Sequence, residues 1–249
     1  MIPTKDKELL DQEKQLAAQA ALQWVRDGML VGLGTGSTAA HFIRLLGEVV
    51  KAGKLRIQAT ATSVASETLA RQLGIPLVEP HRGLRFDLTV DGADELDPQL
   101  NLIKGGGGAL LREKVLATAS DYMLVIADSS KAVAQLGQFP LPLEVVSFAL
   151  PWVLDAVADL GGNPVVRMDK NDPNKYAHSD QGNLLVDCHF NHLPNPTELA
   201  RQLETIPGLV EHGLFLGLAR AALVVRGGQA QVLRPGSAPQ PATDFTELP

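Results

Sequence analysis

One stretch of the chain, residues 91–114, concentrates residue types that are common in catalytic and anion-binding sites. It reads DGADELDPQLNLIKGGGGALLREK, so carboxylates open it, Lys104 precedes four consecutive glycines, and Glu113 falls about one turn into an expected helix. The stretch offers a potential base, an ammonium group, carboxylates and backbone amides that no side chain covers. We therefore predict here a site for a polar, anionic substrate.

Each part of this stretch also has a simpler explanation. Residues 91–94 could form only a turn, the glycines could be a flexible connector, and Glu113 could lie on a solvated helix face. The acidic spacing does not match the calcium-binding loop of an EF-hand, whereas carboxylate-bound Mg²⁺ stays compatible with the composition. The coincidence of all parts within one stretch favours a functional site.

A second loop, GTGST at residues 34–38, could bind the anionic end of a substrate. It follows an apolar run at 29–33 and precedes an expected helix at 39–46. Such a loop presents amides, hydroxyls and the positive end of a helix dipole to an anion. It lacks the lysine of a P-loop, and Ala39 replaces the third glycine of a dinucleotide-binding motif, so the loop suits a single phosphate. Two lysines, Lys14 on the first helix and Lys131 after a later strand, could add charge, although lone lysines are usually solvent-exposed.

The elements that position these residues alternate along the first half of the chain. The expected strands are 29–33, 55–62, 75–78, 86–90 and 122–127, and the expected helices are 8–26, 39–46, 64–73 and 109–118. This alternation predicts parallel βαβ units in a Rossmann-like layer sandwich. Residues 91–94 then lie at the carboxyl end of a strand, where open α/β sheets bind their ligands.

The pattern changes after a proline-rich junction at residues 138–142. The expected order is strand 143–148, helix 151–160, strand 164–168, polar hairpin 169–183, strand 184–190, helix 196–206 and strand 208–212. This is the ferredoxin-like β-α-β-β-α-β order. We therefore predict an α/β protein with a Rossmann-like parallel-sheet main domain, residues 1–135 plus 207–249, and a smaller ferredoxin-like α+β domain, residues 136–206. Residues 214–218 and 221–225 are expected to return to the main sheet, and a peripheral strand followed by disorder is expected from residue 227.

Composition narrows the functional classes. The net charge of −6 and the pI of about 5.5 argue against a nucleic-acid partner. No apolar run has the length of a membrane span, and the charged N-terminus lacks the apolar core of a signal peptide. The single cysteine, Cys188, fits a reducing compartment. The histidine spacing supports no zinc site. We predict a cytoplasmic protein that binds neither nucleic acid nor membrane.

Six blocks of the sequence, taken in order, closely resemble ribose-5-phosphate isomerases of the A type. The blocks are GLGTGSTAAHF at 32–42, DGADE at 91–95, KGGGGALLREK at 104–114, IADSSK at 126–131, FPLPLEV at 139–145 and IPGLVEHGLF at 206–215. The resemblance runs from about residue 8 to about residue 228. Gly108 and Leu111 depart from the residues that relatives often carry, and Lys14 follows a somewhat longer N-terminus.

The resemblance implies interconversion of D-ribose 5-phosphate and D-ribulose 5-phosphate through an enediolate. It assigns Glu113 as the base, Lys104 and the glycine amides as stabilisers of negative charge, and Asp91 and Asp94 as partners of the sugar hydroxyls, with Asp91 assisting ring opening. The implied substrate-binding residues are Lys14, Thr35, Gly36, Ser37, Thr38, Asp91, Gly92, Ala93, Asp94, Lys104, Gly105, Gly106, Gly107 and Lys131, with Ser37 and Thr38 on the phosphate. No metal or organic cofactor is implied, and the family forms homodimers or homotetramers.

Two other functions compete with this interpretation. The first is another sugar-phosphate enzyme on the same kind of fold, such as a deaminase/isomerase or a lactonase, against which the block at 104–114 argues. The second is a sugar-phosphate-sensing domain without catalytic activity. The presence of both Glu113 and Lys104 argues against a sensor, which has no need of a base.

Overall fold

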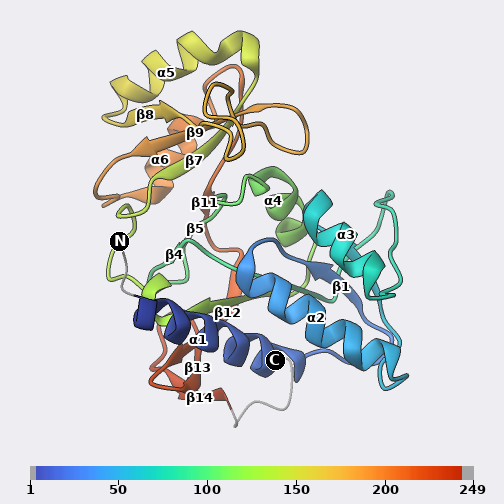
Figure 1. The fold of residues 1–249 in the computed structure, drawn as a ribbon. Coiled ribbons are helices and arrows are strands. Elements are labelled where there is room, and N and C mark those ends of the chain that lie inside the picture. The colour runs from blue at the N-terminus through green and yellow to red at the C-terminus, as the bar shows by residue number, and fades with distance from the viewer. Residues whose placement is uncertain (1–3, 243–249) are drawn as a thin grey trace.

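The larger part of the molecule is built on a seven-stranded sheet in the order β14-β13-β12-β6-β3-β1-β2. The computed structural model describes residues 4–242 (Figure 1). The parallel strands are β1 (Leu30–Leu33), β2 (Gln58–Ala61), β3 (Leu88–Asp91), β6 (Met123–Asp128) and β12 (Ala219–Arg226). At one edge β13 (Gln229–Leu233) and β14 (Gln240–Pro241) continue the sheet antiparallel. The predicted Rossmann-like layer is thus confirmed.

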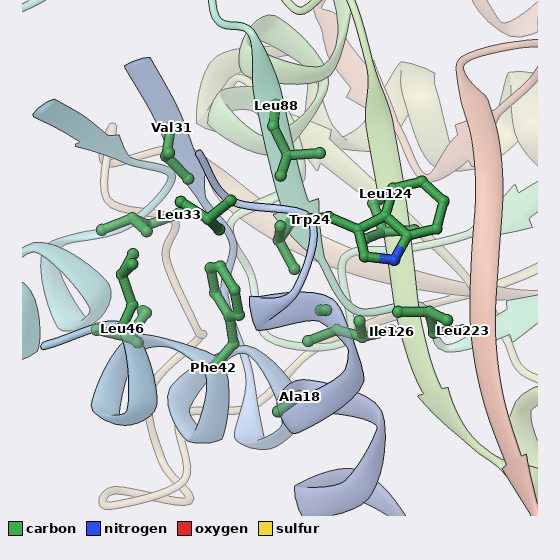
Figure 2. Packing of buried hydrophobic residues seen from close by; sticks show 14 of the residues in the cluster. Ala18, Trp24, Val31, Leu33, Phe42, Leu46, Leu88, Leu124, Ile126 and Leu223 are labelled. Carbon is green, nitrogen blue, oxygen red and sulfur yellow. The ribbon is translucent and has the colours of Figure 1, made fainter. Parts of the chain in front are cut away.

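Helices α1 (Thr4–Leu22), α2 (Ser37–Lys51) and α3 (Val64–Gln72) pack on one face of this sheet. Figure 1 shows α1 and α2 lying in front of the strands. The buried side chains of α2 recur three and four positions apart, which gives the helix one apolar stripe. Phe42 and Leu46 of this stripe point toward Val31 and Leu33 of β1 (Figure 2).

The second face of the sheet carries α4 (Leu110–Thr118) and a small antiparallel sheet. Strand β6 is buried along its whole length because alternate side chains enter different cores: Leu124 and Ile126 meet the helices of the first face, and Val125 and Ala127 pack on the second. The small sheet comprises β4 (Glu95–Leu96), β5 (Leu102–Ile103) and β11 (Leu214–Phe215).

The smaller part of the molecule is a four-stranded antiparallel sheet in the order β10-β7-β9-β8. Its strands are β7 (Leu141–Val145), β8 (Asn163–Val166), β9 (Leu184–His189) and β10 (Leu209–His212), and its helices are α5 (Leu150–Asp159) and α6 (Pro196–Leu203). Short 3-10 helices, η1 (Ser129–Lys131) and η2 (Ser147–Ala149), precede β7 and α5. The element order confirms the ferredoxin-like arrangement, which Figure 1 shows at one end of the molecule.

The small three-stranded sheet connects the two parts. Leu96, Leu102 and Phe215 pack in the core on the second face of the main sheet, whereas Ile103 and Leu214 pack in the core of the smaller part. Neighbouring residues of a strand point to opposite faces, so two-residue strands are enough to serve both cores. The glycine loop that follows β5 is therefore held between the two parts.

Three sequence expectations about elements were wrong in detail. Residues 75–78 form a single bridge between Leu77 and Ala59 instead of a strand, because Pro76 has no amide hydrogen to extend the ladder. Residues 214–218 do not join the main sheet, since β11 pairs with β5 and Gly217, at φ 66°, turns the chain toward β12. The first helix spans 4–22, where 8–26 was expected.

The C-terminal expectation is met as far as the structure reaches. The peripheral strand predicted after residue 227 is present as β13, and β14 follows it. The disorder expected beyond falls on residues 243–249, outside the described residues. Among residues 4–242, no helix combines the length and the apolar character that crossing a membrane requires.

Candidate active site

Asp91, Lys104 and Glu113 meet in the interior, although three different elements carry them. Asp91 ends β3, Lys104 follows β5 directly, and Glu113 lies in the first turn of α4. The Lys104 Nζ atom lies 3.0 Å from Asp91 Oδ2 and 3.4 Å from Glu113 Oε1, and it donates a hydrogen bond of 2.6 Å to the Gly92 carbonyl. The exposed fraction of the Lys104 side chain is only 2%. One buried ammonium group therefore serves two buried carboxyl groups.

This burial sets the protonation of the cluster. Burial raises the pKa of Glu113 to about 8, against the opposing attraction of Lys104 and with added repulsion from Asp91. The pKa of Asp91 is also raised, first by burial. Burial lowers the pKa of Lys104, but the summed attraction of Asp91 and Glu113 outweighs burial and raises it above its ordinary value. A carboxyl group with a pKa near neutrality is suited to accept a proton and return it.

Two carboxylate oxygens of the cluster have no hydrogen-bond partner among the described residues. Asp91 Oδ1 accepts from the amides of Thr35 at 3.0 Å and Gly92 at 2.7 Å. Asp91 Oδ2 is buried with only the Lys104 ammonium group beside it, 3.0 Å away and outside hydrogen-bond geometry, and Glu113 Oε2 is buried without a hydrogen-bond partner. Leaving a buried acceptor unsatisfied costs free energy, and such atoms in a folded protein call for an explanation. A bound ligand that carries hydroxyl groups would supply the missing donors.

The glycine loop between β5 and α4 approaches Asp94 closely. The Gly106 amide donates to Asp94 Oδ2 at 2.7 Å. A Cβ atom at Gly106 would lie 2.6 Å from Asp94 Oδ1, and Gly105 has a φ of 102°, which side chains rarely tolerate. The loop therefore requires glycine at these positions, and it is not merely a flexible connector.

The second loop is placed against the same cluster from the other side. A Cβ atom at Gly34 would lie 2.2 Å from Asp91 Oδ1, so only glycine lets the loop reach Asp91. Gly36, at φ 106°, precedes α2 and has no side chain to cap the amides of the first turn. Those amides and the positive end of the helix dipole form an anion-binding arrangement.

A cavity of about 130 Å³ lies between the two loops. Thirteen of the fifteen predicted site residues line it: Lys14, Thr35, Gly36, Ser37, Thr38, Gly92, Ala93, Asp94, Lys104, Gly105, Gly107, Glu113 and Lys131. The other two, Asp91 and Gly106, do not line it but contact residues that do, Lys104 and Asp94 respectively. Lys14 reaches the cavity from α1, with its Nζ atom 4.0 Å from Asp128 Oδ2. The lining thus combines the GTGST loop and three lysines with the carboxyl groups of Asp94 and Glu113.

Two groups of residues around this cavity escaped the sequence interpretation. Thr35 Oγ1 lies within hydrogen-bonding distance of Thr62 Oγ1 at 2.7 Å and Ser63 Oγ at 2.8 Å. Hydroxyl groups that follow β2 therefore hold the GTGST loop in place. Arg167 donates to carbonyls of the glycine loop from the smaller part. The available signal for Arg167 was a charged residue beside an apolar strand, with Asp187 in a second apolar strand.

The acidic residues around the cavity also bear on whether a metal ion could bind there. Within residues 4–242, no three or more His, Cys, Asp or Glu side chains are grouped so that they could hold a metal ion. Asp91 and Asp94, the pair considered for Mg²⁺, instead accept hydrogen bonds from backbone amides.

Comparisons with known proteins agree on one family. The family model of ribose 5-phosphate isomerase A (phosphoriboisomerase A) matches residues 58–229. The ribose-5-phosphate isomerase A of Sphingopyxis alaskensis is 50% identical over 226 residues, which cover 91% of this chain and 97% of that protein. The Nitrobacter hamburgensis protein of the same name is 51% identical over 222 residues, covering 86% and 94%.

Solved structures give the same result. The ribose 5-phosphate isomerase of Plasmodium falciparum superposes with a TM-score of 0.87 at 32% identity, covering 92% of this chain and all (100%) of that one. A D-ribose-5-phosphate isomerase in complex with phospho-erythronic acid superposes with a TM-score of 0.87 at 36% identity, covering 90% and 99%.

Fold, site and likenesses together define an aldose–ketose isomerase that acts on sugar phosphates. The chain belongs to the ribose 5-phosphate isomerase A family, as the sequence blocks predicted. Its reaction is the interconversion of D-ribose 5-phosphate and D-ribulose 5-phosphate, in the non-oxidative branch of the pentose phosphate pathway. The deaminase, lactonase and sensor alternatives are thereby set aside.

Proposed function

We propose that Glu113 carries the proton between C2 and C1 of the open-chain sugar. The observation that carries this assignment is a buried carboxyl group on the cavity wall with one oxygen free of hydrogen bonds and a pKa of about 8. Glu113 removes the C2 proton, the electron pair of that bond forms the C1–C2 double bond, and the C1 oxygen takes the negative charge. The hydroxyl proton on O2 passes to O1, Glu113 returns its proton to C1, and the ketose results.

Lys104 and the glycine loop stabilise the enediolate in this mechanism. Fixed donors act most strongly where negative charge develops, since they need no reorganisation during the reaction. Lys104 and Gly107 both line the cavity beside Glu113, which supports this role. Asp94, on the same wall, is placed to hold a sugar hydroxyl. We assign ring opening to Asp91, whose Oδ2 atom is paired with Lys104 and would have to reach the substrate beside that ammonium group.

The phosphate is assigned to the GTGST loop. Ser37 and Thr38 supply hydroxyls and amides at the start of α2, and Lys131 and Lys14 add positive charge on the same side of the cavity. A related isomerase has been solved in complex with phospho-erythronic acid, which supports a phosphorylated sugar acid as a ligand of this kind of site. That acid carries a phosphate at one end and a planar, charged pair of oxygens at the other, as an enediolate phosphate does.

The test is conversion of ribose 5-phosphate to ribulose 5-phosphate by the purified protein, with EDTA present throughout. We expect turnover that survives the chelator, because the mechanism assigns every step to protein groups. Loss of activity to EDTA would bring back a carboxylate-bound Mg²⁺ at Asp91 and Asp94. Near-normal turnover by Glu113→Gln would remove Glu113 from the role of base.

We also propose that the enzyme is a homodimer or homotetramer assembled through its smaller part. An apolar patch there supports this: Phe148 is 82% exposed, Trp152 is 62% exposed, and their ring centroids lie 5.6 Å apart. Exposed aromatic pairs of this kind are typical of protein interfaces. Sedimentation velocity should show an oligomer that Trp152→Ser weakens. A wild-type monomer at working concentration would contradict the proposal.

The division into domains and the cellular compartment are proposals of the same kind. We retain residues 1–135 as the first segment of the main domain, but β10 pairs with β7, so the smaller domain is better ended at residue 212 than at 206. We place the enzyme in the cytoplasm. The single cysteine supports this, because burial raises the pKa of Cys188 to about 12 and leaves an unreactive thiol that suits a reducing compartment.

A further inference from the structure

Arg167 connects the smaller sheet to the glycine loop of the active site. It follows β8, and its Nη1 atom donates to the Gly105 carbonyl at 3.2 Å and to the Gly106 carbonyl at 3.3 Å. The remaining donors of the guanidinium group face Asp187 on β9, with Nε 2.8 Å from Oδ2 and Nη2 2.5 Å from Oδ1. This forked pairing fixes the plane of the guanidinium group, which a single hydrogen bond would leave free to turn.

The two accepted hydrogen bonds determine where the loop amides point. A trans peptide is planar, so its carbonyl and the following N–H point in opposite directions. No cis peptide bond occurs within the described residues. Drawing the Gly105 and Gly106 carbonyls toward Arg167 therefore turns the amides of Gly106 and Gly107 the other way. The Gly106 amide accordingly meets Asp94 Oδ2 at 2.7 Å, and Gly107 lines the cavity.

The same contacts strengthen these amides as donors. A cationic donor on a carbonyl oxygen polarises the peptide and makes its N–H a better hydrogen-bond donor. Asp187 balances the charge of Arg167, so the pair adds little net field and acts mainly through orientation.

The glycine loop packs closely against the smaller sheet, because a Cβ atom on Gly108 would lie 2.9 Å from Leu185 of β9. The smaller sheet thus forms the backing of the glycine loop.

We propose that Arg167, held by Asp187, is a positioning residue for the isomerisation. It fixes the glycine loop so that the Gly107 amide and the Asp94 carboxylate meet the reacting end of the sugar. The inference rests on the proposed role of the loop amides in stabilising the enediolate. It gives the smaller domain a part in catalysis in addition to any part in assembly.

The test compares Arg167→Met, Arg167→Lys and Asp187→Asn with a matched control. Methionine keeps apolar length without donors, and lysine keeps the charge but cannot fork to Asp187 and the carbonyls together. The control is Arg201→Met on α6, which removes an ion pair of the same domain, to Glu198 at 2.6 Å, away from the loop. Each variant is assayed for kcat, KM, inhibition by phospho-erythronic acid and melting temperature.

We expect Arg167→Met to lower kcat by about 10- to 100-fold, the range for misplacing a catalytic group by a fraction of an ångström to an ångström, with KM nearly unchanged. Inhibition by phospho-erythronic acid should weaken in parallel with kcat/KM, because both depend on donors aimed at charged oxygens. Arg167→Lys should recover part of the loss, Asp187→Asn should show a smaller loss of the same kind, and Arg201→Met should show none.

A wild-type kcat in folded Arg167→Met would overturn the proposal, as would a loss that only follows the fraction of folded protein. If Arg167→Met fails to fold, the Asp187→Asn variant provides the test, because it keeps the guanidinium group and removes only its charged partner. An unchanged kcat in Asp187→Asn would then overturn the proposal. Glu113→Gln, measured alongside, separates the two assignments. Full activity in Glu113→Gln would refute the base, whereas a normal kcat in Arg167→Met and Asp187→Asn would refute only the positioning role.

Discussion

Two lysines ten positions apart, Lys104 buried and Lys114 half-buried, lie over the same aromatic ring and behave differently. The Nζ atoms of Lys104 and Lys114 lie 5.5 Å and 5.1 Å from the centroid of Phe215. Lys114 donates to Glu211 Oε1 at 2.5 Å and to the His212 carbonyl at 2.6 Å. Burial lowers the pKa of Lys114 despite Glu211, whereas two carboxyl groups raise the pKa of Lys104 despite its burial.

The difference lies in how many charges each lysine must balance. Lys114 and Glu211 form a pair that is neutral overall, so no carboxyl charge is left over beside this lysine. Lys104 faces both Asp91 and Glu113, so it cannot balance both carboxyl charges. Burial, with repulsion from Asp91 added, therefore raises the pKa of Glu113 to about 8 despite the attraction of Lys104. The excess of carboxyl groups over ammonium groups is therefore found at Glu113, the residue proposed to accept a proton and return it. Glu113 and Lys114 are neighbours in the sequence, yet one joins the unbalanced cluster and the other the balanced one.

The sharpest test of this comparison removes one carboxylate from each cluster. Glu113→Gln should retain binding of ribose 5-phosphate and lose at least about 10²-fold in kcat, the low end for a positioned general base. Glu211→Gln, the matched change beside Lys114, should leave kcat near that of the wild type. Steady-state kinetics with a direct binding measurement for both variants would check this. Equal losses in kcat would remove the distinction between the clusters.

The next effect concerns the lysines themselves. Lys104→Met should lower kcat by about 10² to 10³-fold, the usual cost of losing one donor to a developing oxyanion. Lys114→Met should instead lower mainly the melting temperature, because it leaves Glu211 without its partner and Lys114 does not line the active-site cavity. Calorimetry and kinetics on the two variants would show whether function and stability separate in this way. A Lys114 variant with normal stability and lost turnover would reverse their roles.

The raised pKa of Glu113 predicts two opposite trends with pH. Glu113 must be ionised to act as a base, so kcat/KM should rise about tenfold between pH 7 and pH 9, with its midpoint near the pKa of about 8. Stability should fall as pH rises from about 4.5 to about 8, because only the folded chain still holds this proton there. Urea unfolding across this range would measure the second trend. Glu113→Gln should flatten both trends, and Glu211→Gln should flatten neither.

The smallest effect is expected at the phosphate end, away from both lysines. Replacing Ser37 and Thr38 with alanine should raise KM for ribose 5-phosphate by roughly tenfold, since a typical hydrogen bond has a net worth of about 0.5–1.5 kcal/mol, a factor of ten is about 1.4 kcal/mol, and the backbone amides stay in place. The kcat value should change little. A lowered kcat with an unchanged KM would mean that the phosphate binds elsewhere and that Ser37 and Thr38 act in the chemical step, as Lys104 does.

Much of the fold was predictable because periodic side-chain patterns report helices and strands directly. The βαβ alternation and the ferredoxin-like order follow from such patterns. The three-stranded sheet does not, since β4, β5 and β11 have two residues each and no period to detect. At residues 75–78 the error was the opposite one: the apolar run predicted a strand, but Pro76 prevents the ladder from extending.

The site was predictable where its residues form compact motifs and hidden where contacts are distant in sequence. The strand-end carboxylates and the two glycine-rich loops carry local signals, and the structure gathers them around one cavity. Arg167 contacts carbonyls 61 and 62 positions away and belongs to no motif. The raised pKa of Glu113 was equally hidden, because it depends on burial and on the charges of Lys104 and Asp91, which only the fold brings together.

The three-stranded sheet also has a consequence for the order of events during translation. The Lys104 amide donates to the Gly213 carbonyl at 2.9 Å, and the Gly213 amide donates to the Pro142 carbonyl at 2.7 Å. Every proposed substrate contact has left the ribosome once residue 131 emerges, but the strand that seats Lys104 is synthesised more than eighty residues later. A nascent chain therefore carries a complete set of reactive side chains in an inactive state. We therefore expect activity to begin only after residues 213–215 have been synthesised.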